Sequence, residues 1–275
     1  MAANLDRLFW QCDSGNDRTK RTPAPDTIPA GFVSEFTRVN QHDVHSISGG
    51  TDSDKPPVLL LHGALASRRY LLPTARILSK YRRVFVPEMP GHGASSNPEH
   101  ALSVPEQANV IALWCRKNTI KRFDLFANSY GCQVAAQLTK DHPELINSLT
   151  LSGPTCDPSA PTLLGQAYRL YQDGKFEPPG AQHQLFEDLY DLTLPLALET
   201  CRHMLADDIT NKLPFIGCST LVVRGANDPI STQPWNEHIA EKLAKSKLAV
   251  IDEAPHCVNY AAAEKLTELL MGFLG

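Results

Sequence analysis

The chain has 275 residues, enough for one large domain with a buried core. It contains 26 lysine and arginine residues and 30 acidic residues. The resulting net charge of −4, without any basic run, argues against a nucleic-acid partner. No uncharged apolar stretch reaches the length of a membrane span, about 20 residues, and residues 1–7 lack the layout of a signal peptide, so we expect a cytoplasmic protein without a membrane partner.

The predicted elements begin with a polar, proline-interrupted stretch over residues 1–30, which indicates a loosely held N-terminal arm. Two antiparallel strands are expected over 32–39 and 45–48, and beyond them apolar runs alternate with helical patterns. We expect the later strands at 57–61, 84–89, 123–128, 148–152, 220–223 and 248–251. We expect the helices at 69–81, 104–117, 130–141, 232–245 and 260–273. This alternation predicts an α/β fold with a mostly parallel sheet flanked by helices.

One long segment, residues 154–214, interrupts the alternation between the strands at 148–152 and 220–223. It holds three helix-like pieces, at 163–171, 182–192 and 194–205. The apolar side chains of these pieces have two possible roles, which are to line a pocket or to pack the segment against the rest of the domain.

The most informative residue is Ser129, which stands between the apolar strand at 123–128 and the helical pattern that follows. The small residues Ala127 and Gly131 flank it, two positions away on each side. This arrangement is typical of a nucleophile elbow, in which a tight turn strains the serine backbone and leaves almost no room for flanking side chains. The motif alone is weak evidence, because a serine followed two residues later by glycine is expected about once by chance.

A serine attacks a carbonyl carbon readily only when an imidazole takes its proton and a carboxylate orients that imidazole. His256 follows the last predicted strand, and Asp228 follows the strand at 220–223. Both residues therefore lie at carboxyl ends of strands, where open α/β sheets gather their sites. Asp157, after the strand at 148–152, is the rival candidate for the acid.

Taken together, these motifs resemble the α/β-hydrolase family over residues 31–275. The matching positions, in chain order, are His62-Gly63, Gly91-His92-Gly93, Ser129, Asp228 and His256. The order serine, aspartate, histidine is the order found in that family. The resemblance implies an α/β-hydrolase core formed by residues 31–153 and 215–275, and a helical cap inserted over the active site by residues 154–214.

The resemblance also implies an oxyanion hole made of two backbone N–H groups, those of Tyr130 and Ala64. Tyr130 directly follows the nucleophile at the start of a helix, where the helix dipole favours negative charge. Ala64 follows His62-Gly63, and Leu65 is the alternative donor. The family resemblance gives His62 a structural role in shaping this loop rather than a role as a base.

The candidate substrate-binding residues are apolar or aromatic and come from the loop after the strand at 57–61 and from the cap. They are Leu65, Tyr168, Leu185 and Tyr190. We expect them to line a pocket for a small molecule, and the competing interpretation is that the cap residues only pack the cap onto the core.

We therefore predict a serine hydrolase that cleaves an ester or similar acyl bond of a small, largely apolar substrate, without a metal or organic cofactor. The seven cysteines are scattered without a Cys-x-x-Cys pair, which predicts neither a zinc site nor a disulfide framework. One alternative is a carbon–carbon bond hydrolase of the meta-cleavage type, favoured by Asn128 and Asn259 but disfavoured by the lack of further glycines after Gly63. The other is a non-catalytic receptor for a small molecule.

Overall fold

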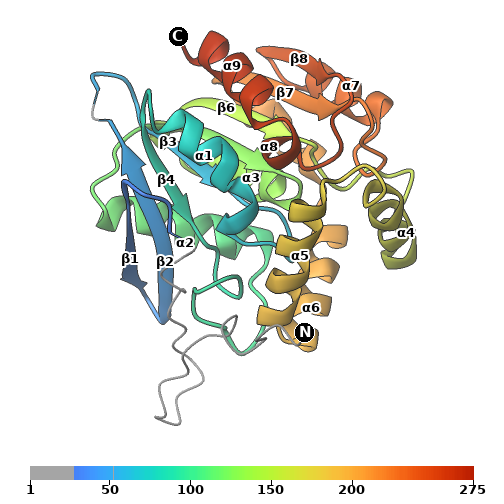
Figure 1. Cartoon of the computed structure of the whole chain (residues 1–275), viewed down its shortest axis with the longest axis horizontal. Coiled ribbons are helices and arrows are strands. Elements are labelled where there is room, and N and C mark those ends of the chain that lie inside the picture. Colours follow the sequence, from blue (N-terminus) through green and yellow to red (C-terminus); the bar gives the residue numbers. More distant parts are fainter. Residues whose placement is uncertain (1–27, 52) are drawn as a thin grey trace, which may run out of the picture.

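The computed structural model describes residues 28–51 and 53–275 (Figure 1). The arm predicted at 1–30 therefore falls almost entirely outside the described residues. The strands are β1 Phe32–Val39, β2 His42–Gly50, β3 Val58–Leu61, β4 Arg83–Pro87, β5 Phe123–Asn128, β6 Ile146–Ser152, β7 Ser219–Gly225 and β8 Ser246–Ile251.

These strands form one sheet in the order β1-β2-β4-β3-β5-β6-β7-β8. The pairings of β1 with β2 and of β2 with β4 are antiparallel, and the remaining pairings are parallel. The mostly parallel sheet predicted from the sequence is confirmed. Because the six strands β3 to β8 run in the same direction, the residues that follow them meet at one edge of the sheet.

The helices lie close to their predicted positions. They are α1 Leu72–Leu78, α2 Val104–Lys117, α3 Tyr130–Asp141, α4 Leu163–Asp173, α5 Pro179–Asp191, α6 Leu194–Ala206, α7 Gln233–Lys242, α8 Val258–Ala261 and α9 Ala263–Leu274, with short 3₁₀ turns η3 Arg68–Leu71, η4 Pro143–Leu145, η5 Ile209–Asn211 and η6 Leu213–Phe215. The helix expected at 260–273 is broken in two, because Ala262 leaves the helical region with φ −134° and ψ 43°. No helix in the described part of the chain is both long and apolar enough to cross a membrane.

Alternate residues of β3 bury their side chains on opposite faces of the sheet, as the period of a strand requires. Leu59 and Leu61 join the hydrophobic cluster that includes residues of α2 and α3. Val58 and Leu60 join the cluster that includes residues of α1 and α9. The sheet is therefore covered on both faces, which explains why its central strands read as continuous apolar runs.

Residues 154–214 leave the sheet after β6 and return to it at β7. Their three long helices α4, α5 and α6 lie on the side of the molecule opposite β1 and β2 (Figure 1). α4 contacts α6, and α5 contacts the turn η3 that follows β3. We refer to residues 154–214 as the cap segment, and its predicted role over the active site remains a prediction.

Candidate active site

The backbone of Ser129 is strained. Ser129 joins β5 to α3 with φ 58° and ψ −127°, a conformation that residues with a side chain rarely adopt. Two residues on, a side-chain carbon added at Gly131 would lie 2.6 Å from the carbonyl oxygen of His62, so only glycine fits there. Ala127, on the other side, is fully buried in β5. The small flanking residues therefore let the chain turn sharply enough to present the serine at the end of the strand.

The end of β6 contacts both Ser129 and His256. The backbone N–H of Ser129 donates to the carbonyl oxygen of Ser152 at 2.9 Å. The next residue, Gly153, packs against His256, because a side-chain carbon at Gly153 would lie 3.0 Å from two atoms of the imidazole ring. The nucleophile and base predicted from the sequence therefore flank the same short segment, although they come from distant parts of the chain.

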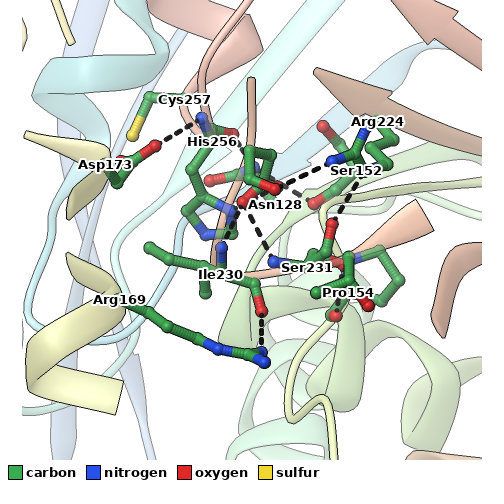
Figure 2. Close-up of polar contacts among 12 residues, drawn as sticks. Asn128, Ser152, Pro154, Arg169, Asp173, Arg224, Ile230, Ser231, His256 and Cys257 are labelled. Carbon is green, nitrogen blue, oxygen red and sulfur yellow. Dashed lines mark hydrogen bonds and ion pairs between the residues drawn. The ribbon is translucent and has the colours of Figure 1, made fainter. Parts of the chain in front are cut away.

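Asp228 and His256 form a direct hydrogen bond. Nδ1 of His256 lies 2.8 Å from Oδ2 of Asp228, and both side chains are buried. The other carboxylate oxygen of Asp228 accepts the backbone N–H groups of Ile230 at 2.7 Å and Ser231 at 2.9 Å. Figure 2 shows Ile230, Ser231 and Asn128 gathered around His256. Since Nδ1 donates its hydrogen to Asp228, Nε2 of the neutral ring is free to accept a proton.

The environment of His256 favours its charged form. Burial opposes the imidazolium ion, but the charge of Asp228 and its hydrogen bond, together with the charges of Asp173 and Glu177, raise the pKa of His256 to about 9. Nε2 of His256 is buried and has no hydrogen-bond partner within residues 28–51 and 53–275. A buried, strongly basic and unpartnered nitrogen is suited to taking a proton from a hydroxyl group in contact with it.

The rival acid, Asp157, is engaged elsewhere. Its carboxylate accepts hydrogen bonds from Ser159 N at 2.8 Å and Thr232 Oγ1 at 2.5 Å, and forms an ion pair with Arg169 at 3.2 Å. These partners hold the beginning of the cap segment to the turn before α7. The contacts of Asp157 are therefore those of a structural residue.

The loop after β3 is shaped by His62 and adjoins the serine. Nδ1 of His62 donates to the carbonyl oxygen of Gly63 at 2.9 Å, and Nε2 accepts the backbone N–H of Met89 at 3.0 Å. Both ring nitrogens are occupied, as expected for a structural histidine. A side-chain carbon at Gly63 would lie 3.0 Å from Cβ of Ser129, so Ala64 directly follows a residue that packs against Ser129.

The two predicted oxyanion donors occupy positions compatible with that role. Tyr130 is the first residue of α3, so its backbone N–H has no carbonyl partner inside the helix. Leu65 has φ 58°, and this left-handed residue turns the chain immediately after Ala64. The assignment of Tyr130 and Ala64 to an oxyanion hole remains a prediction.

Tyr70 and Asn128 connect three loops of the site, and sequence analysis did not identify this role. The hydroxyl of Tyr70 accepts the backbone N–H of Gly63 at 2.6 Å and donates to Oδ1 of Asn128 at 2.9 Å. Nδ2 of Asn128 donates to the carbonyl oxygens of Ser152 at 3.1 Å and His256 at 3.3 Å. No local sequence signal distinguishes Tyr70 from an ordinary aromatic core residue.

The candidate substrate-binding residues differ in exposure. Leu65 and Leu185 are half-buried, whereas the side chain of Tyr168 on α4 is 62 % exposed. The side chain of Tyr190 lies outside the described residues. Their predicted role in lining a pocket remains a prediction, and for Tyr168 the observed exposure requires that the substrate reach the surface of α4.

The cysteines and acidic residues of the described chain do not gather into a metal site. No group of three or more histidine, cysteine, aspartate or glutamate side chains in residues 28–51 and 53–275 has the arrangement of metal ligands. Six cysteines of these residues are free thiols, and Cys12 lies outside them.

Comparison with known sequences supports the resemblance. Residues 56–177 match a protein family described as alpha/beta hydrolase fold. The chain is similar to human monoacylglycerol lipase ABHD6, with 23 % identity over 262 residues that cover 82 % of this chain and 77 % of the relative. A frog relative, monoacylglycerol lipase abhd6-B of Xenopus laevis, is 26 % identical over 266 residues, with the same shares of each chain.

Comparison with solved structures confirms the fold. A membrane phospholipase A described as a bacterial virulence factor superposes with a TM-score of 0.77 at 21 % identity, covering 89 % of this chain and 86 % of that one. The enol-lactonase of Burkholderia xenovorans LB400 also gives a TM-score of 0.77, at 19 % identity, covering 87 % of this chain and 99 % of that one. At these low identities, the structural similarity shows that the fold is shared and does not identify a substrate.

Proposed function

Because the chain belongs to the α/β-hydrolase fold family, we propose that it is a serine hydrolase that cleaves an ester or related acyl bond through an acyl-enzyme on Ser129. The observation that carries the proposal is the buried Asp228–His256 pair, 2.8 Å apart, which packs against Gly153, the residue after the one that binds the backbone of Ser129. Ser129 itself has φ 58°. A strained serine and an imidazole oriented by a carboxylate are the components that nucleophilic catalysis by serine requires, and they support the proposal.

In the first half of the reaction, Oγ of Ser129 bonds to the carbonyl carbon of the substrate and its proton passes to Nε2 of His256. Asp228 stabilises the imidazolium ion that forms, without taking the proton itself. The negative charge moves to the former carbonyl oxygen, which the backbone N–H groups of Tyr130 and Ala64 stabilise. The C=O bond then re-forms, the bond from the carbonyl carbon to the alcohol oxygen breaks, and the imidazolium gives its proton to that oxygen, so that the alcohol leaves and the acyl group stays on Ser129.

In the second half, a water molecule replaces the alcohol. His256 takes a proton from the water, and the resulting hydroxide bonds to the acyl carbon. The bond from Ser129 to that carbon breaks, and His256 returns its proton to Oγ of Ser129. The carboxylic acid product leaves, and all enzyme groups return to their starting state.

The names of the similar proteins support an acyl ester as the substrate class. They include a monoacylglycerol lipase, a phospholipase A and an enol-lactonase, names that denote cleavage of ester bonds. The half-buried leucines Leu65 and Leu185 supply apolar surface for a small, largely apolar acyl or alcohol group. An acyl ester of this kind is the substrate we propose.

The two asparagines that favour the carbon–carbon bond hydrolase make contacts within the fold. The amide of Asn128 is occupied by Tyr70, Ser152 and His256. Nδ2 of Asn259 donates to the carbonyl oxygen of Tyr70 at 3.0 Å. Both side chains therefore hold the fold together through these contacts.

A panel of substrates tests the proposal. Purified protein would be assayed with p-nitrophenyl esters of increasing chain length, a monoacylglycerol, an aryl lactone and a meta-cleavage dienone, each alongside Ser129→Ala. We expect hydrolysis of at least one ester or lactone that is lost in Ser129→Ala. Turnover of the dienone alone would favour the carbon–carbon hydrolase, and no turnover of any substrate would favour the receptor.

A further inference from the structure

Two acidic residues of the cap segment contact the loop between β8 and α8 that carries His256, which we call the base loop. Oδ1 of Asp173, the last residue of α4, accepts the backbone N–H of His256 at 3.0 Å. Oε1 of Glu177, one turn further along the chain, accepts the backbone N–H of Cys257 at 2.7 Å. Figure 2 shows Asp173 beside the backbone of His256 and Cys257. Two consecutive amides of the base loop are thus held by carboxylates of another part of the chain.

This pair of acids costs free energy to bury. Asp173 is 1 % exposed and Glu177 is 9 % exposed, and Oε2 of Glu177 is buried without a hydrogen-bond partner among the described residues. Burial raises the pKa of Asp173, and burial together with the charge of Asp173 raises the pKa of Glu177 to about 7. Both carboxyl groups also lie close enough to His256 for their negative charges to raise the pKa of its imidazole.

The charges of Asp173 and Glu177 act on His256 in the same direction as that of Asp228. The groups whose charges act on His256 are Asp228, after the end of β7, and Asp173 and Glu177 of the cap segment. The neighbouring thiol of Cys257 is also titratable, and Tyr70 of η3 interacts with that thiol. Arg224 is directed to the carbonyl oxygen of Asp228 at 2.9 Å and does not contact the imidazole ring. Asp173 and Glu177 both stabilise the charged form of His256.

We propose that Asp173 and Glu177 are positioning residues for His256, so that docking of the cap segment and correct placement of the base are one event. The proposal rests on the proposed serine hydrolase function. The carboxylates fix the base loop by accepting two successive N–H groups, and their negative charges favour the imidazolium ion that forms when Ser129 is deprotonated. A cap that lifted from the core would release both effects at once.

The test separates the hydrogen bond from the charge. Asp173→Asn keeps an oxygen that can accept the N–H of His256 but removes the charge, whereas Asp173→Ala removes both. We expect Asp173→Ala to lower kcat roughly 10- to 100-fold with KM little changed, because the base is misplaced. We expect Asp173→Asn to keep kcat within about threefold at the optimal pH, since the acceptor remains. The acid limb of its kcat/KM profile should move to lower pH, because the imidazolium has lost a nearby negative charge.

Glu199→Ala is the matched control. Glu199 is also an acidic residue of the cap segment, and it accepts a backbone N–H of the core, that of Ala101 at 2.7 Å, away from the base loop. This variant loses a comparable contact between cap and core, so kcat and the acid limb should stay at the wild-type values. A loss of kcat in Glu199→Ala equal to that in Asp173→Ala would overturn the specific role of Asp173.

Labelling of Ser129 by a fluorophosphonate keeps the two proposals distinguishable. If wild-type protein neither labels at Ser129 nor hydrolyses any ester, the proposed function fails. If it does both, and Asp173→Ala has wild-type kcat and an unmoved acid limb, the positioning role fails while the function stands. If Asp173→Ala does not fold, Asp173→Asn provides the test. In that case, an acid limb of kcat/KM at the same pH as in the wild type would overturn the role of the charge.

Discussion

Gly153 lies directly against the imidazole ring of His256. A side-chain carbon added at Gly153 would stand 3.0 Å from both Nδ1 and Cε1 of the ring, and 3.2 Å from Oδ2 of Asp228. Gly153 also has φ 55°, a conformation that favours glycine. Gly153 therefore packs directly against the His256–Asp228 pair, and no side chain fits between its backbone and the ring.

Gly153→Ala should impair catalysis more than an ordinary loop substitution does. The new methyl group would push the ring away from its position, lowering kcat by roughly 10- to 100-fold, and the left-handed backbone would cost about 1 kcal/mol of stability. Steady-state kinetics and thermal unfolding measure the two effects. Gly217→Ala is the control, since nothing lies within 4 Å of a side-chain carbon at Gly217. Equal kcat in both variants would contradict the tight contact with His256.

Asp228→Asn should mainly lower kcat, whereas Asp157→Asn should mainly lower stability. Asp228→Asn should lower kcat by roughly 10³- to 10⁴-fold, because an amide in that position can hold the imidazole in the wrong tautomer. Asp157→Asn should mainly lower the thermal stability, because Asp157 pairs with Arg169 and Thr232 and not with the base. Kinetics and thermal unfolding on both variants give the answer. If Asp157→Asn instead caused the large loss of kcat, the carboxylate that orients the histidine would be Asp157, in the loop after β6.

The activity should rise with pH further into the alkaline range than an ordinary histidine would allow. The pKa of His256 is raised to about 9, and only the neutral ring accepts a proton from Ser129. The kcat/KM for a stable ester, measured from pH 5.5 to 10 and corrected for spontaneous hydrolysis, should therefore increase through an ionisation above 6.5. A plateau that is already complete at pH 6.5 would contradict the raised pKa.

The sequence predicted the sheet, the helices and the positions of Ser129, Asp228 and His256 because each depends on local patterns. Strands and helices follow from the spacing of apolar residues, and the candidate catalytic residues stand directly after strands. The contacts of Asp173 with His256 and of Tyr70 with Asn128 span 83 and 58 residues, and no local pattern encodes them. Asp173 and Glu177 lie four positions apart near a helix end, a pattern typical of a solvent-exposed surface. Their burial therefore follows only from the three-dimensional structure.

Removing the acid at Glu177 should flatten the pH dependence of stability. Its pKa is raised from the ordinary value of 4.5 to about 7, so the folded protein holds an extra proton between these values. The stability that Glu177 provides is fully present below pH 4.5 and is lost as pH rises through 7. Urea unfolding of wild type and Glu177→Gln at pH 5 and pH 7.5 should show their difference changing by on the order of 2 kcal/mol, in favour of the variant at the higher pH. A constant difference would contradict the raised pKa.

The most direct test of the central claim is to identify the residue that a fluorophosphonate modifies. The protein would be labelled near pH 8, digested, and the adduct located by mass spectrometry, with Ser129→Ala treated in parallel after its fold is checked by circular dichroism. We predict one adduct, on the peptide that contains Ser129, and none in Ser129→Ala. An adduct on another serine, or equal labelling of the folded variant, would contradict the account of Ser129 as the nucleophile.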